Sequence, residues 1–102
     1  MPRWRLAKRD LASPENWHMF YVYALLSTIN KDLYIGYTDD LKRRFFEHNS
    51  GFTSSTKTNR PWKLVYYEAY NSKKDATKRE KQLKMHRSKE DLRKQLMNSL
   101  TE

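Results

Sequence analysis

Alternating side-chain types mark the first regular element of the chain, the run "FYVYALLS" at residues 20–27. Phe20, Val22, Ala24 and Leu26 fall on one face of a strand, with Tyr21, Tyr23 and Leu25 on the other, because successive side chains of a strand alternate. The run "LYIGYT" at 33–38 has the same β-rich character, and "TINKD" between the two has loop chemistry. We therefore expect an antiparallel hairpin. Gly36, inside the second strand, indicates close approach of another group to the backbone.

A helix is predicted after the hairpin. Thr38 is a good N-cap, the acidic pair at 39–40 suits the positive end of a helix, and "SG" at 50–51 is a typical C-terminal stop. The stripe that this helix turns toward the sheet comprises Leu41, Phe45 and His48.

The second half of the chain predicts one more strand and two more helices. After the polar, basic loop 52–61, the run "WKLVYYEAY" at 62–70 has strand composition. Ser72 with Asp75 resembles a capping pattern that opens a helix through about Met85, and Ser88 with Asp91 repeats it for a last helix. The order ββαβαα predicts an α+β fold, a three-stranded antiparallel sheet flanked by helices. We expect a single domain at 19–102, preceded by a basic N-terminal arm at 1–18 that carries Trp4 and Trp17.

The charge balance points to a polyanionic partner. Lysine and arginine number 21 against 12 acids, which gives the 102-residue chain a net charge of +9. No apolar run is long enough to span a bilayer, so nucleic acid is favoured over a membrane. The absence of cysteine excludes disulfides, thiolate zinc sites and cysteine nucleophiles, and it fits a reducing compartment. The first 18 residues lack the apolar stretch of a secretory signal, so we expect a soluble, cytoplasmic protein.

One acidic residue stands in an unexpected place. Ala76, Glu80 and Leu83 are spaced at i, i+4 and i+7, so they share one helix face, and Glu80 occupies a position where a core hydrophobe is expected. A buried or half-buried carboxylate is costly unless it is paired with a cation. Two interpretations remain open, an ion pair with an arginine or a weakly held Mg²⁺ that keeps most of its waters.

Four further residues are ambiguous when taken singly. Arg44 and His48 lie four apart on the predicted helix, so both can reach a groove beside the sheet. Arg44 can equally belong to a solvated basic face, and His48 can be a last-turn histidine favoured by the helix dipole. Tyr23 and Tyr34 on the hairpin are candidate site residues, but strand tyrosines commonly serve packing alone.

Taken together, these segments resemble a known family. "YVY" at 21–23, "YIG" at 34–36, "RRFFEHNSG" at 43–51 and "REKQLK" at 79–84 resemble the GIY-YIG endonuclease superfamily, and more closely its small stand-alone members related to the nuclease domain of the repair subunit UvrC. The resemblance spans residues 20 to about 96. Tyr21 stands where the family name has glycine, and an asparagine of some longer relatives has no match here.

The resemblance implies a metal-dependent DNA endonuclease or nickase, with a role in DNA repair or recombination. Its catalytic residues would be Tyr23, Tyr34, Arg44, His48 and Glu80, with Glu80 holding Mg²⁺ or Mn²⁺ and Arg44 facing the phosphoryl charge. Tyr23 would be the general base. His48 is the alternative base because its ordinary pKa is closer to neutrality.

A basic surface would hold the DNA backbone with little sequence specificity. We expect its phosphate contacts to come from Lys42, Arg43, Lys57, Arg60, Lys78, Lys81 and Lys84. A single site predicts a monomer or weak dimer that cuts one strand at a time. The alternative function is a nucleic-acid-binding module that keeps the fold and does not cut.

Overall fold

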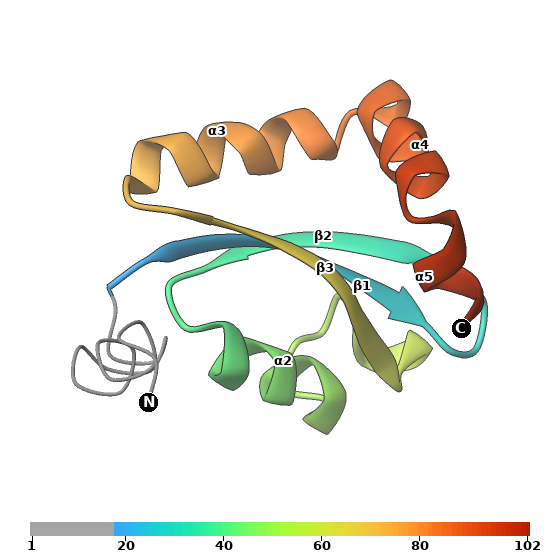
Figure 1. Cartoon of the computed structure of the whole chain (residues 1–102). Helices are drawn as coiled ribbons and strands as arrows, with labels where there is room; N and C mark the ends of the chain where they lie inside the picture. The colour runs from blue at the N-terminus through green and yellow to red at the C-terminus, as the bar shows by residue number, and fades with distance from the viewer. Residues whose placement is uncertain (1–17) are drawn as a thin grey trace, which may run out of the picture.

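The computed structural model describes residues 18–102, so the predicted arm at 1–18, including Trp4 and Trp17, lies outside the described residues except for His18. Its elements, labelled as in Figure 1, are β1 (Phe20–Ser27), β2 (Leu33–Thr38), α2 (Leu41–Ser50), the short 3-10 helix η2 (Lys57–Asn59), β3 (Trp62–Tyr70), α3 (Lys73–Leu83), α4 (His86–Gln95) and α5 (Met97–Thr101). The predicted α+β order ββαβαα is confirmed. The last helical region consists of two segments, α4 and α5, which Leu96 separates.

The sheet is antiparallel with strand order β2-β1-β3, so β1 is the central strand. Tyr23 of β1 lies opposite Gly36 of β2 and opposite Tyr67 of β3. The β1–β3 register shifts between Ala24 and Leu25, which indicates a bulge in β3. Both faces of β1 are buried from Val22 to Ser27, because helices cover the sheet on each side.

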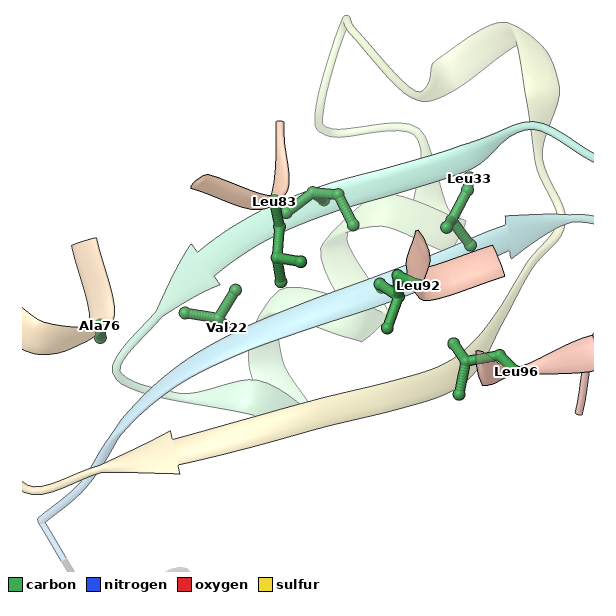
Figure 2. Close-up of a cluster of buried hydrophobic side chains, with 8 residues drawn as sticks. Val22, Leu33, Ala76, Leu83, Leu92 and Leu96 are labelled. Carbon is green, nitrogen blue, oxygen red and sulfur yellow. The ribbon is translucent and has the colours of Figure 1, made fainter. Parts of the chain in front are cut away.

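One core lies between the sheet and helices α3 and α4, on the upper side in Figure 1. Figure 2 shows strand and helix side chains meeting there. The buried members are Val22, Ala24, Leu33, Ile35, Ala76, Leu83, Leu92 and Leu96. Each fully buried leucine stabilises the fold by about 1.5–3 kcal/mol relative to an exposed one, so this cluster holds α3 and α4 on the sheet.

A second core lies on the opposite face, between the sheet and α2, on the lower side in Figure 1. Tyr23, Leu25 and Trp62 are buried there, with Tyr34, Leu41, Phe45 and Leu64 packed against them. Asn49 joins α2 to β3, because its amide accepts from the Trp62 N–H at 2.6 Å and donates to the Trp62 carbonyl at 3.0 Å. This core therefore contains two of the predicted site residues, Tyr23 and Tyr34.

Helix boundaries differ from the sequence predictions in three places. Asp40, not Thr38, is the N-cap of α2, since its side chain accepts from the Arg43 N–H at 3.1 Å. Helix α3 begins after Ser72 as predicted, but it ends at Leu83 rather than Met85, and the Ser72 side chain makes no capping hydrogen bond. The prediction that the last helix opens at Ser88 is wrong: α4 begins at His86, two residues earlier. The predicted stop at Gly51 is confirmed, and its φ of 86° is one that glycine adopts without strain.

Candidate active site

The β1–β2 hairpin positions the two candidate tyrosines on the face covered by α2. Tyr23 is 2% exposed, and its ring lies 6.4 Å from that of Tyr34 between centroids. A Cβ atom on Gly36 would overlap the Tyr23 hydroxyl, so only glycine at this point of β2 leaves room for it. The close approach expected at Gly36 is thus that of a phenol from the neighbouring strand. The absence of a side chain at Gly36 therefore leaves the space beside β2 that the Tyr23 hydroxyl fills. Strand β2 is an edge strand of the sheet.

His48 of α2 is fully buried, and both of its ring nitrogens have hydrogen-bond partners. The Tyr23 hydroxyl lies 2.7 Å from Nε2, and Thr56 Oγ1 lies 2.8 Å from Nδ1. Thr56 Oγ1 also lies 3.3 Å from the carbonyl oxygen of Thr53, to which its hydroxyl can donate. Each contact joins a ring nitrogen to a hydroxyl that can donate or accept, so the tautomer of a neutral His48 sets the direction of both hydrogen bonds. The hydrogen-bonded contacts therefore form a continuous chain from Tyr23 through His48 to Thr56.

The electrostatic surroundings keep this pair neutral. Burial, and next the Arg44 guanidinium, lower the pKa of His48 to about 4, although the Glu47 carboxylate opposes them. Burial also raises the pKa of Tyr23; Tyr34 and Glu80 add to the rise, and Arg44 opposes it. His48 is therefore not a cation favoured by the helix dipole, because loss of hydration outweighs the dipole.

Arg44 lies at the rim of this cluster. Its side chain is 32% exposed, and Nη1 donates to Glu47 Oε1 at 3.1 Å. The other Glu47 oxygen pairs with Arg43 at 3.3 Å. Arg44 is thus held by a neighbour and is not part of a freely solvated face. Glu47 was missed by the sequence analysis, although its spacings of three and four from the arginines favour such pairs.

Glu80 comes from the other layer of the molecule, since α3 and α2 lie on opposite faces of the sheet (Figure 1). Its neighbour Arg79 donates through Nε to both Glu68 oxygens on β3, at 3.0 and 3.1 Å. Residues 79 and 80 point about 100° apart on a helix, so Glu80 lies on the flank of α3 away from Glu68. The pKa of Tyr37 on β2 is consistent with this position of Glu80. Burial raises that pKa most, Asp39 next, and the Glu80 carboxylate adds to the rise.

The predicted arginine partner of Glu80 is wrong, because the ion pair is with Lys84 at 3.2 Å. The Glu80 side chain is 21% exposed, so it is half-buried. Within residues 18–102 its carboxylate makes no hydrogen bond or ion pair with Tyr23, Tyr34, Arg44 or His48. Its negative charge nevertheless contributes to raising the pKa of the Tyr23 hydroxyl. The structure thus brings four candidate residues together and places the fifth within electrostatic range of them.

Glu80 has the chemistry of a ligand for Mg²⁺. In the described part of the chain there is no group of three or more histidine, cysteine, aspartate or glutamate side chains that could enclose a metal. Mg²⁺ does not need such a group, because it retains several waters and takes one or two carboxylates together with substrate phosphate. A half-buried carboxylate whose partner is a flexible, 54% exposed lysine fits that role.

Comparison with known proteins places the chain in a family. A model of the GIY-YIG catalytic domain matches residues 19–94. The chain belongs to the GIY-YIG family. A UPF0213 protein of Bacillus pumilus is 40% identical over 77 residues, which are 74% of this chain and 76% of that relative. A UPF0213 protein of Listeria innocua is 42% identical over 66 residues, covering 64% and 70%. The solution NMR structure of a UPF0213 protein from Bacillus halodurans is 36% identical, covers 72% of this chain and 81% of its own, and has a TM-score of 0.48.

The GIY-YIG assignment confirms the family expected from the sequence and supports a nuclease-type function with a DNA substrate. The two name-giving motifs lie side by side in the sheet, because Tyr23 pairs with Gly36 in the β1–β2 register. In the described residues, no helix is both long enough and apolar enough to cross a membrane.

The basic residues expected to contact DNA differ in how the GIY-YIG domain holds them. Four are exposed and make no ion pair within residues 18–102: Lys42, Lys57, Lys78 and Lys81. Arg43 instead pairs with Asp39, Asp40 and Glu47, and Lys84 pairs with Glu80. Arg60 is half-buried beside Gly51, where a Cβ atom would meet its guanidinium. The four exposed lysines are therefore the best-placed phosphate contacts.

Proposed function

We propose that this protein is a Mg²⁺-dependent DNA endonuclease that cuts one strand at a time and acts in DNA repair or recombination. The observation that carries the proposal is the buried hydrogen bond between Tyr23 and His48, with Arg44 at its rim. Packing alone does not require a phenol, an uncharged imidazole and a guanidinium to converge there. Phosphodiester hydrolysis does require a proton acceptor and a fixed cation next to each other.

Tyr23 is the group that we assign to the attacking water. Its pKa is raised by burial, so a free phenolate is disfavoured. A phenol that passes its own proton to His48 Nε2 while it accepts one from water does not have to exist as phenolate. Both ring nitrogens of His48 are already hydrogen-bonded, which supports Tyr23 over His48 as the contact with water.

The remaining candidates have roles that follow from their positions. Arg44 presents a planar fork of donors that suits a phosphoryl group, and a phosphate that binds it competes with Glu47. Tyr34, whose ring lies 4.9 Å from that of His48, orients the water. Glu80 would hold Mg²⁺, which when bound supplies Lewis-acid stabilisation of the phosphoryl and leaving oxygens.

Nicking of supercoiled plasmid tests the proposal. Purified protein is incubated with plasmid in Mg²⁺ or in EDTA, alongside Glu80→Gln and the matched control Glu90→Gln, an exposed glutamate paired with an arginine on α4. We expect nicking in Mg²⁺ by the wild type and by Glu90→Gln only, with gel-shift affinity in EDTA retained by all three proteins.

Two results would contradict the proposal. Equal nicking by Glu80→Gln and the wild type would remove the metal-ligand assignment. Binding without nicking, on plasmid and on branched or nicked duplexes alike, would favour the alternative, a nucleic-acid-binding module.

A further inference from the structure

Thr56 has no assigned role in the site, yet it is fully buried and directly contacts His48. It lies in the loop between α2 and β3, immediately before η2. Its backbone is fixed on both sides: its N–H donates to the Thr53 carbonyl at 3.2 Å, and its carbonyl accepts from Trp62 Nε1 at 2.8 Å. The Thr56 hydroxyl is therefore presented to the imidazole from a rigid support.

The direction of the Thr56 hydroxyl is coupled to the tautomer of a neutral His48, because the two groups share one hydrogen bond. The Thr53 carbonyl lies 3.3 Å from Thr56 Oγ1 and can take the hydroxyl hydrogen. When the hydroxyl donates there, its oxygen accepts from Nδ1–H at 2.8 Å, and Nε2 is left as an acceptor. In the opposite tautomer Nε2–H would donate to the Tyr23 oxygen, and His48 could not take the Tyr23 proton.

We propose that Thr56 is a positioning residue that holds His48 in the Nδ1–H tautomer, so that Nε2 is free to accept the proton of Tyr23 during cleavage. The inference rests on the proposed nuclease function for its catalytic consequence. The tautomer itself is a property of the folded protein without substrate.

Two substitutions distinguish the role of the Thr56 hydroxyl from that of side-chain packing. Thr56→Val keeps the shape of the side chain and removes the hydroxyl, whereas Thr56→Ser keeps the hydroxyl and removes a methyl group. Ring-nitrogen ¹⁵N NMR distinguishes protonated from unprotonated imidazole nitrogens. The chain has three histidines, and the other two, His18 and His86, are exposed.

We expect wild type and Thr56→Ser to show His48 protonated at Nδ1, and Thr56→Val to show Nε2–H or a mixture. Wild-type protein with hydrogen on Nε2 would overturn the proposal, and so would Thr56→Val protein with the unchanged tautomer. If Thr56→Val does not fold, the wild-type and Thr56→Ser spectra still decide it: Nδ1–H in both supports the proposal, and Nε2–H in either overturns it.

Cleavage kinetics test the consequence separately. A misplaced proton acceptor lowers kcat, so Thr56→Val should lose at least about tenfold in kcat with KM for DNA unchanged, and Thr56→Ser should restore it. A kcat loss equal in both variants would indicate a packing role and contradict the proposal. Absence of cleavage by the wild type would refute the nuclease function, while the NMR result would still decide the tautomer.

Discussion

Acid should destabilise this protein through His48 well before its carboxylates protonate. The imidazole is fully buried, and its pKa is lowered to about 4 from an ordinary 6.5. The groups that face it are Arg44 and Glu47 on α2, the two tyrosines of the hairpin and the Thr56 hydroxyl. Phenols and guanidinium groups do not titrate between about pH 5 and 7.5. His48 is therefore the group of this cluster whose protonation is expected to differ between the folded and the unfolded chain in that range.

The direction in which stability changes with pH follows from which state of the chain binds the proton. Between about pH 4 and 6.5 the unfolded chain takes up a proton at His48 and the folded chain does not, so stability rises with pH across this window. A pKa difference of about 2.5 corresponds to about 3 kcal/mol in total, of which about 2 kcal/mol is lost between about pH 7.5 and 5. Such a loss is a large part of the stability of a small domain.

Urea denaturation at fixed ionic strength and several pH values measures this effect. His48→Gln should flatten the dependence of the unfolding free energy on pH, so that its curve approaches that of the wild type as the pH falls. The control, His86→Gln, replaces an exposed histidine of α4 and should keep the wild-type slope. Parallel curves for wild type and His48→Gln would refute a buried, neutral His48, as would an NMR titration of its ring near pH 6.5.

Three further results are expected. Gly36→Ala should destabilise the fold by about 1–3 kcal/mol, because the new methyl group displaces the Tyr23 hydroxyl; wild-type stability and nicking in this variant would contradict the packing. Glu68 accepts hydrogen bonds from Arg79, Tyr66 and Tyr70. Although burial raises the pKa of Glu68, these bonds hold it below its ordinary value, and Glu68→Gln weakens them. We expect it to lower the unfolding free energy by about 1–3 kcal/mol, with cleavage per folded molecule unchanged, as urea titration and nicking assays would report. DNA affinity should fall about a hundredfold between about 50 and 200 mM salt if four lysines contact phosphates; fluorescence anisotropy measures this, and an affinity independent of salt would exclude them.

The strands were predictable to the residue, because alternation, β-branched content and loop composition act locally. The bounds 20–27, 33–38 and 62–70 match the structure. Helix starts were less predictable, since several residues compete for each cap. Thr38 and Asp40 are both good caps, and Thr38 instead accepts from the Asp40 N–H at 3.0 Å, which leaves the cap to Asp40.

Four residues of the candidate site that lie together in the structure were predictable as a set, but the hydrogen bonds among them were not. Periodicity placed Arg44 and His48 on one side of α2, and the family resemblance joined them to Tyr23, Tyr34 and Glu80. Thr56 carries no such signal, because a threonine in a polar loop contacts His48 only after β3 has returned the chain to the sheet. The arginine partner considered for Glu80 was mistaken because Lys84, one turn later on α3, reaches its carboxylate at 3.2 Å.

The adjacency of Arg79 and Glu80 restricts how the length of α3 can change. One residue attaches the helix to β3, and the next projects to the opposite flank. Inserting or deleting a single residue between Ala76 and Glu80 would turn the following part of the helix by about 100° relative to its packed start. Glu80 would then leave its present place on α3 while the sheet remained intact. Length changes in the turn between α3 and α4 would not alter the rotational position of Glu80 on α3. The chain can therefore lengthen in that turn without displacing the Glu80 carboxylate.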